Sequence, residues 1–201
     1  MATARQGGLD VRQGGIELLD GESESFDAIT MNHVLEHLHD PTRVLRACHR
    51  LLKDGGQLWL STPNIDSYGH RIFGKDWRGL EAPRHLVLFG PDSLNRALRD
   101  AGFGRIRWMP QQNVYQGMFR ASHAIKRGRL PEGAPPAPLR TRALAALARA
   151  CGLLARNRRE FLTATAFRLP AGRGRPPQQG GAVRPRQKQA RGRAASERTP
   201  R

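Results

Sequence analysis

The chain of 201 residues lacks the features that define several common classes of protein. Its two cysteines, Cys48 and Cys151, are too few for a disulfide framework or a cysteine-rich metal site, and they fit a reducing compartment. No stretch of about 18 apolar residues is present, so we expect no membrane-spanning helix. The N-terminus also lacks the apolar core of a signal peptide. We therefore expect a cytoplasmic protein.

Acidic residues are scarce only in the second part of the chain. The net charge is +17, yet residues 1–112 hold fourteen Lys or Arg and fourteen Asp or Glu, so the whole excess lies in residues 113–201. Lysine is scarce as well, with four against thirty arginines, which we interpret as a coding bias because phosphate recognition does not require the exclusion of lysine. We expect no nucleic-acid partner except through this basic appendage.

The segment from Phe26 to Asn64 carries the clearest structural pattern. Its first apolar run is too short for a helix, and apolar residues then recur at helical spacing after Asp40-Pro41, a typical helix start. Gly55-Gly56 ends that helix, and residues 57–62 form a second apolar run typical of a strand covered on both faces. This order predicts two parallel strands joined by a crossover helix, and hence an α/β fold.

The flanking segments predict a single core with additions. We expect a short strand over residues 9–12, a long polar loop over 64–90, a helix over 91–101 and a strand over 105–109. The loop carries Tyr68, Phe73 and Trp77, aromatic residues able to cover a substrate cleft, although Trp77 fits a loop core as well as a substrate platform.

The remainder differs in composition from the core. Residues 113–158 predict a helical insert or lid with a helix over 139–155, and residues 159–169 contain a closing strand over 160–167. Residues 170–201 are rich in Arg, Pro and Gly without periodicity, which predicts disorder.

The order of motifs resembles a known family. Asn32-His33-Val34-Leu35-Glu36-His37, Asp40-Pro41, Leu51-Leu52-Lys53-Asp54-Gly55-Gly56 and Thr62-Pro63-Asn64 are similar to the second half of class I S-adenosylmethionine-dependent methyltransferases. Asp76-Trp77-Arg78, Pro83-Arg84-His85-Leu86, Phe89, Asp92-Ser93-Leu94 and Ala101-Gly102-Phe103 continue the series, which covers about residues 8–112 and weakly 160–168. The resemblance implies a partial Rossmann-like, doubly wound sheet, S-adenosylmethionine as cofactor, and methyl transfer to oxygen or nitrogen of a small-molecule acceptor.

One element of the family pattern is missing. Family members hold the cofactor through a first strand and a glycine-rich turn at a helix N-terminus. No Gly-x-Gly pattern lies upstream of Phe26, and no hydrophobic strand precedes Gly7-Gly8 or Gly14-Gly15. We therefore expect a truncated gene product, or a wrongly chosen Met1, with impaired cofactor affinity.

Several polar residues follow the first predicted strand, where ligands of open α/β sheets bind. The catalytic candidates are His33, His37 and His85, and the cofactor-binding candidates are Ile16, Glu17, Asn32, His33 and Glu36; we expect no metal ligands. Its position at the end of the first predicted strand makes His33 the first candidate for a residue beside the methyl group. The resemblance implies an orienting role for Glu36 and His37 and a contact of the Ile16-Glu17 backbone with adenine.

Each histidine also has a structural interpretation, and these stay open at this point. His33 and Glu36 fit hydrogen bonds within the loop, and His85 fits either the acceptor side or an anchor to a backbone carbonyl. Two other functions are open too. One is a zinc hydrolase, since residues 33–37 match H-x-x-E-H, although Asp40-Pro41 leaves little room for the regular helix that this motif needs. The other is a non-catalytic remnant or binding module whose basic tail contacts nucleic acid.

Overall fold

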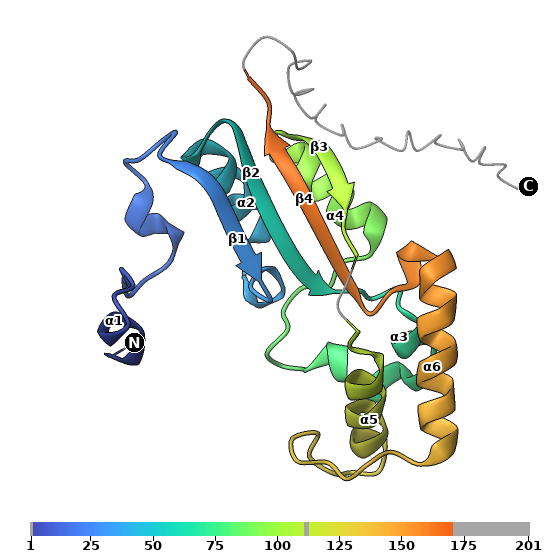
Figure 1. Cartoon of the computed structure of the whole chain (residues 1–201). Coiled ribbons are helices and arrows are strands. Elements are labelled where there is room, and N and C mark those ends of the chain that lie inside the picture. The colour runs from blue at the N-terminus through green and yellow to red at the C-terminus, as the bar shows by residue number, and fades with distance from the viewer. Residues whose placement is uncertain (1, 111–112, 171–201) are drawn as a thin grey trace, which may run out of the picture.

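The computed structural model of the chain describes residues 2–110 and 113–170 (Figure 1). The predicted disordered basic tail therefore lies, except for Pro170, outside the described residues. None of the helices within the described part combines the length and the apolar character needed to cross a membrane.

Ten helices and strands and five short 3-10 turns follow one another in these residues. The helices are α1 (Ala2–Gln6), α2 (Pro41–Leu51), α3 (Tyr68–Phe73), α4 (Pro91–Asp100), α5 (Tyr115–Lys126) and α6 (Leu139–Leu154). The strands are β1 (Phe26–Asn32), β2 (Leu52–Pro63), β3 (Phe103–Trp108) and β4 (Phe161–Arg168). The 3-10 turns are η1 (Ile16–Leu19), η2 (Leu35–His37), η3 (Gly74–Asp76), η4 (Arg78–Leu80) and η5 (Arg156–Arg158).

The four strands form one sheet in the order β1-β2-β4-β3. β1 and β2 are parallel, and β4 is antiparallel to both of its neighbours, β2 and β3. Helix α2 makes the crossover between the parallel pair, and it begins where predicted, because Asp40 Oδ1 accepts a hydrogen bond from the Arg43 amide (2.9 Å) and Pro41 occupies the first turn. The predicted α/β fold with parallel strands joined by a crossover is confirmed.

Two predicted strand positions are wrong. Residues 9–12 form no strand, since the segment lies apart from the sheet and the Val11 carbonyl accepts hydrogen bonds from the Arg5 guanidinium instead of a neighbouring strand (Figure 1). The second strand begins at Leu52 rather than Gln57, because Phe26 pairs with Leu52 ahead of an irregularity in the register. Gly55, with a φ of +79°, lies inside this irregular part of β2.

The main core lies between one face of the sheet and helices α2 and α4. Leu58 and Leu60 of β2 pair with Ala166 and Ala164 of β4. Leu58, Leu60 and Ala166 form one buried cluster with leucines of both helices. The alternate positions of β2 and β4 lie on the other face, where Ser61 Oγ is 3.2 Å from Thr163 Oγ1. The alternation along these strands therefore determines the face of the sheet on which α2 and α4 pack.

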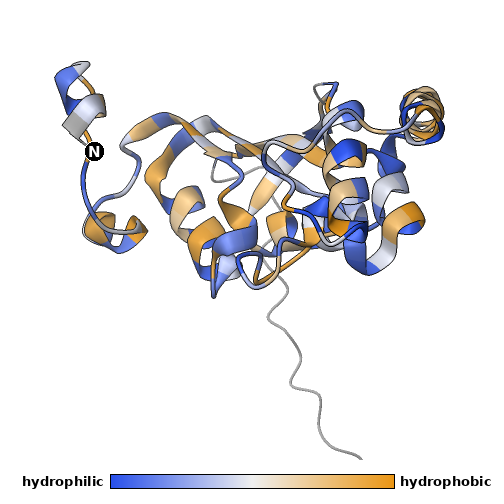
Figure 2. Ribbon diagram, turned by 90° about the horizontal axis from the view of Figure 1, so that it is seen from below, coloured by the Kyte–Doolittle hydropathy of each residue, from blue (hydrophilic) through white to orange (hydrophobic). Residues whose placement is uncertain are grey.

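A second buried cluster joins α3, α5 and α6, which together we call the helical unit. It lies beyond the carboxyl ends of β1 and β2 in Figure 1 and to one side of the sheet in Figure 2. Phe73 and Trp77 are buried here, with the Phe73 ring 5.3 Å from that of Phe119. These two loop aromatic residues thus form core rather than covering a cleft, because α5, which the sequence pattern did not predict, packs on them.

A buried carboxylate links the helical unit to the sheet. Glu160, directly before β4, accepts hydrogen bonds from the Gly69 amide (2.8 Å) and from Trp77 Nε1 (3.0 Å). Burial raises the pKa of Glu160, and the two hydrogen bonds offset only part of that effect. Asn64, at the end of β2, reinforces the junction by donating to the carbonyls of Asn157 and Arg159 (2.9 and 2.8 Å).

Candidate active site at the strand ends

The chain turns sharply where β1 ends. Asn32 pairs with Ser61 of β2, and the next amide, that of His33, still donates to the Ser61 carbonyl (3.0 Å). His33 then adopts a φ of +53°, in the left-handed region that is uncommon for residues other than Gly, although Asn, Asp and His occur there more often than the rest. Such a backbone conformation costs free energy and persists only where the surrounding structure imposes it, which is often the case at functional sites.

A buried carboxylate holds the His33 ring. Glu36, in the turn η2, is completely buried, and its Oε1 lies 3.0 Å from His33 Nδ1. Its second oxygen, Oε2, accepts a hydrogen bond from Thr62 Oγ1 at the end of β2 (3.0 Å). Burial raises the pKa of Glu36, but hydrogen bonds from His33, the Glu36 backbone and Thr62 outweigh burial, so the pKa lies below its ordinary value.

The hydrogen bond fixes the chemistry of the imidazole. An ionised Glu36 only accepts hydrogen bonds, so His33 Nδ1 carries a proton, and in the neutral ring the lone pair is then on Nε2. The His33 side chain is 39% exposed, whereas Glu36 is buried, and the ring stacks edge-on against Phe161 at 4.8 Å. An imidazole that a buried carboxylate orients through Nδ1 can accept a proton at Nε2 when the ring is in its neutral form.

His37 and His85 form a second pair with a different setting. Their rings lie 4.8 Å apart, and each Nδ1 faces a backbone carbonyl, that of Arg84 for His37 (2.9 Å) and that of Gly79 for His85 (2.7 Å). The carbonyl of Glu36 accepts hydrogen bonds from the Leu86 and Val87 amides (2.7 and 3.2 Å). These contacts tie the 79–87 loop to the turn η2, so both histidines anchor that loop.

Glu36, His37 and His85 also bring possible metal-ligand atoms within 4.8 Å of one another. Both oxygens of Glu36, however, already accept hydrogen bonds from His33 and Thr62. The H-x-x-E-H stretch does not form the regular helix of a zinc peptidase, because it runs from left-handed His33 into a single 3-10 turn. The described residues therefore offer the ligand types for a metal but not the helical geometry of that enzyme class.

Ile16 and Glu17, the residues expected to contact adenine, lie apart from the other candidates. Ile16 and Glu17 belong to η1, on the side of β1 that faces away from β2 (Figure 1). Glu17 Oε1 accepts a hydrogen bond from the Gly15 amide (2.8 Å), and Ile16 packs against the main core. Asn32 is exposed at the end of β1. The structure thus brings Asn32, His33, Glu36, His37 and His85 to one end of the sheet and leaves η1 beside its open edge.

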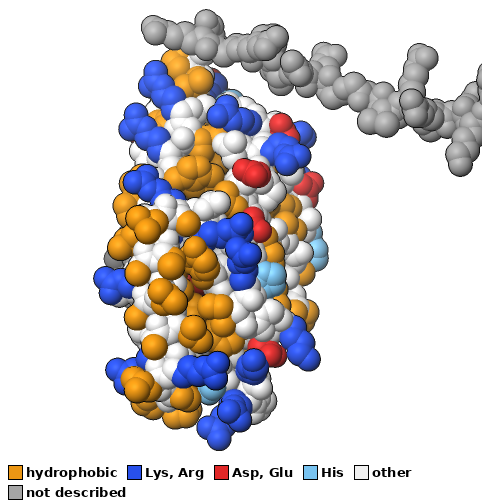
Figure 3. Space-filling model, turned by 90° about the vertical axis from the view of Figure 1, so that its right-hand side faces the viewer, with side chains coloured by type: hydrophobic (Ala, Val, Ile, Leu, Met, Phe, Trp, Pro, Cys, Tyr) orange, Lys and Arg blue, Asp and Glu red, His pale blue; other side chains and the backbone are white. Residues whose placement is uncertain are grey.

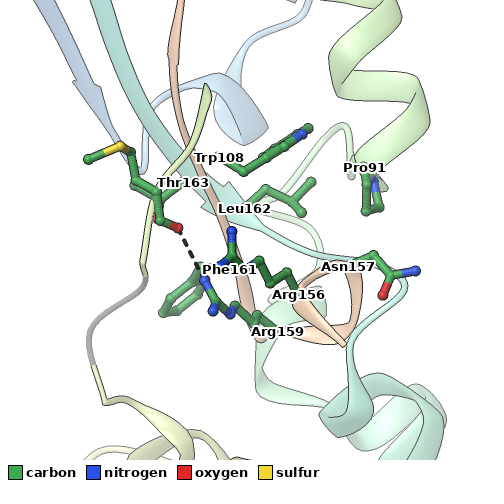
Figure 4. A pocket seen from close by; sticks show the side chains of 9 residues that line it. Pro91, Trp108, Arg156, Asn157, Arg159, Phe161, Leu162 and Thr163 are labelled. Atoms are coloured by element: carbon green, nitrogen blue, oxygen red, sulfur yellow. Dashed lines mark hydrogen bonds between the residues drawn. The ribbon is translucent and has the colours of Figure 1, made fainter. Parts of the chain in front are cut away.

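A cavity of about 210 Å³ opens between β3, β4 and the turn η5 (Figure 4). Its lining is mainly apolar, with polar groups at the rim, and comprises Pro91, Trp108, Met109, Arg156, Asn157, Arg159, Phe161, Leu162 and Thr163. Arg159 Nη1 donates to the Met109 carbonyl (3.3 Å), as the dashed line in Figure 4 shows. Because Phe161 contacts the His33 ring and also lines this cavity, the two features are neighbours.

Neither this cavity nor the hydrogen bond between Thr62 and Glu36 was predicted from the sequence. Trp108 and Phe161 line the same cavity because β3 and β4 are antiparallel, a pairing across more than fifty residues that no local pattern reveals. Thr62 had a visible sign, since it ends a predicted strand next to the one that leads to His33.

Comparison with known proteins gives this geometry a family. The sequence profile of a methyltransferase domain matches residues 3–106, just over half of the chain. This chain belongs to the methyltransferase-domain family. S-adenosylmethionine is the methyl donor of the family, as the resemblance of the motif series implied.

Individual relatives agree with this assignment over shorter segments. The ubiquinone biosynthesis O-methyltransferase of Pseudomonas paraeruginosa is 40% identical over 85 residues, which cover 38% of this methyltransferase-domain chain and 36% of the relative. The Pseudomonas aeruginosa enzyme of the same name (strain PAO1) is 49% identical over 85 residues, with the same coverage. The matches thus span about a third of the length of these curated relatives.

Solved structures share the fold at low sequence identity. A crystal structure described as a SAM-dependent methyltransferase, possible histamine N-methyltransferase, from Thermotoga maritima superposes with a TM-score of 0.52 at 19% identity, covering 83% of this chain and 67% of that one. A SAM-dependent methyltransferase from Archaeoglobus fulgidus gives 0.51 at 16% identity, covering 83% and 71%. The Rossmann-like methyltransferase fold is therefore shared, while the acceptors of those proteins do not transfer at such identity.

Proposed function

We propose that this chain takes part in methyl transfer from S-adenosylmethionine to a hydroxyl oxygen of a small-molecule acceptor, with His33 as the general base. The observation that carries the proposal is the His33–Glu36–Thr62 chain of hydrogen bonds at the carboxyl ends of β1 and β2. A hydroxyl must lose its proton as it is methylated, and in this proposal His33 Nε2 accepts it. The relatives named O-methyltransferases support oxygen over nitrogen as the acceptor atom.

The residues present fit one side of a donor site. Exposed Asn32 and His33 follow a parallel strand at the edge where ligands of such sheets bind, and the open edge of β1 leaves that side accessible. Asn32 and His33 would hold the donor, with its methyl group next to the His33 ring. When bound, S-adenosylmethionine supplies an electrophilic methyl group.

The protein's own residues then have separate tasks. Thr62 holds Glu36 through Oε2, and Glu36 holds His33 Nδ1–H through Oε1, so the ring stays in one tautomer and one orientation. Phe161 supports the ring edge-on and restricts it further. The contribution of these groups is alignment of the acceptor oxygen and removal of its proton.

The neighbouring cavity suggests what the acceptor carries. Trp108, Phe161 and Leu162 give it apolar walls, and Arg156 and Arg159 also line it. An aromatic ring would bury its faces against such walls while its hydroxyl points toward His33. We propose a phenolic acceptor on this ground.

Two measurements test the proposal. Calorimetric titration with S-adenosylmethionine should give binding, and incubation with labelled donor and a panel of phenols and amines should label the phenols. Donor binding with labelling of amines alone would contradict the oxygen acceptor. Absence of donor binding would contradict the function and favour a binding module without catalysis.

A further inference from the structure

Helix α6 exposes most of its leucines and buries mainly small residues, the reverse of an ordinary surface helix. The side that it buries against α5 carries the small residues Thr141, Ala145, Ala148 and Gly152, and one leucine, Leu144, packs against the same cluster and is partly buried. Its other four leucines point outward: Leu139 is 79%, Leu147 60%, Leu153 69% and Leu154 91% exposed. A surface helix normally directs its large apolar side chains to the core and its polar side chains to water.

The outward leucines form one continuous stripe. With exposed Ala143, Ala146 and Ala150 they recur at spacings of three and four residues, the period of one helix face. We call this surface, made of Leu139, Ala143, Ala146, Leu147, Ala150, Leu153 and Leu154, the α6 stripe. Figure 3 looks at this side of the molecule and shows a band of hydrophobic side chains with basic ones along it, and α6 is seen end-on at the outer side of Figure 2.

Arginines flank the stripe. Arg142 and Arg149 follow one border and Arg140 the other, all three are exposed, and none of them makes a side-chain ion pair among the described residues. Residues 113–159 carry ten Lys or Arg against a single acidic residue, Glu132. An apolar stripe bordered by cations on a helix is the pattern of segments that lie in a membrane interface.

We propose that the α6 stripe docks on the surface of an anionic lipid bilayer. The leucines would enter the boundary between head groups and acyl chains, and the arginines would pair with lipid phosphates. A second copy of the chain fits the surface less well, because a two-fold contact would set the same arginines against one another. With 16 residues the helix lies along the interface rather than across it.

Vesicle flotation tests this docking with the full chain. Wild-type protein should float with vesicles of equal parts phosphatidylglycerol and phosphatidylcholine and stay behind with phosphatidylcholine alone. The double variant Leu147→Glu/Leu153→Glu should bind the anionic vesicles at least about tenfold more weakly, because two apolar anchors become charged. Leu9→Glu, a substitution at an equally exposed leucine outside the helix (65%), should change binding by less than about twofold.

The outcomes separate the stripe from simple charge attraction. Residues 171–201 hold nine basic residues and are the same in every variant, so equal binding of wild type and the double variant would show attraction by charge alone and overturn the proposal. A lack of wild-type binding would overturn it too. So would a wild-type dimer that the double variant converts to monomer in sedimentation, since a second copy would then cover the stripe.

A second readout does not depend on the glutamate variants. Cys48 is buried, so a fluorophore on Leu147→Cys with Cys151→Ser would report on the stripe alone. Its emission should shift to the blue with anionic vesicles, and an unchanged spectrum would contradict insertion. Methyl transfer is not needed for either measurement, so failure of the proposed enzymatic function would leave this result interpretable.

Discussion

Glu36 and Glu160 are both completely buried carboxylates, but their surroundings differ in one respect. Glu36 faces an ionisable partner, His33, as well as Thr62, and the pKa of Glu36 is lowered. Glu160 faces two neutral donors, the Gly69 amide and Trp77 Nε1, and burial raises its pKa. The difference teaches that burial alone does not mark a functional acid: Glu36 orients a half-exposed imidazole, whereas Glu160 joins the helical unit to the sheet.

The first prediction contrasts the two carboxylates in activity. Glu36→Gln should lower kcat by about a hundredfold, because a neutral amide no longer fixes the tautomer of His33. Glu160→Gln should leave kcat of the folded protein within a few-fold, because Glu160 touches neither His33 nor the cavity. Steady-state methyl transfer from S-adenosylmethionine to a phenol measures both; a similar loss in the two variants would break the comparison.

The second prediction contrasts them in stability. Glu160→Ala should lower the free energy of unfolding by about 3 kcal/mol, because two buried donors, the Gly69 amide and Trp77 Nε1, lose their acceptor together. Trp77→Phe, which removes only one of these donors, should cost less than Glu160→Ala. Urea denaturation gives both values, and a loss below about 1 kcal/mol for Glu160→Ala would show that the junction is held by other contacts.

The third prediction concerns the small residues inside the helical unit. A Cβ at Gly152 would fall against Tyr115 Oη, the hydroxyl whose pKa burial and the nearby Glu160 charge raise to about 12. Gly152→Ala should therefore destabilise the protein by about 1–3 kcal/mol. Gly117→Ala is the matched control: nothing lies within 4 Å of its new Cβ, so it should stabilise α5 by about 0.5–1 kcal/mol in thermal or urea unfolding. Equal effects of the two substitutions would contradict close packing at Gly152.

The smallest effects are those of pH on stability, and they have opposite signs. The folded-state pKa of Glu36 lies below its ordinary value of 4.5, so its contribution is present above that value and is lost as pH falls through the lowered pKa. The folded-state pKa of Glu160 is raised, so its contribution is present below 4.5 and is lost as pH rises through the raised pKa. Relative to wild type, Glu36→Gln should lose less stability on acidification and Glu160→Gln less on the rise from acid pH.

Urea midpoints taken between about pH 3 and about pH 7 provide the measurement for both variants. If the stability difference from wild type changed with pH in the same direction for both variants, the assigned environments of these carboxylates would be contradicted.

The sequence predicts the sheet part of the fold better than the helical unit. Asp40-Pro41 and the apolar periodicity define α2 and its two strands, since cap, period and burial agree there. Helix α5 has no comparable pattern: it contains Gly117, and its buried residues meet α3 and α6, which lie far away in the sequence. The expected strand over residues 9–12 failed because a strand needs a neighbour to pair with, which local pattern cannot supply.

The candidate site shows the same limit. The position of His33 after a strand could be predicted, whereas its left-handed backbone and its hydrogen bond to Glu36 depend on how the turn η2 closes. The pairing of His37 with His85 joins residues 48 positions apart through carbonyls of a loop, and the sequence left the role of His85 open between two interpretations.

The most direct test of the central claim compares kcat/KM for two histidine variants on the same loop, with S-adenosylmethionine and a phenolic acceptor. His33→Gln removes the imidazole that Glu36 orients, and His39→Gln removes an exposed imidazole six residues later. We predict a loss of at least about a hundredfold for His33→Gln and a change within about twofold for His39→Gln. Equal activity of the two variants would contradict His33 as the base.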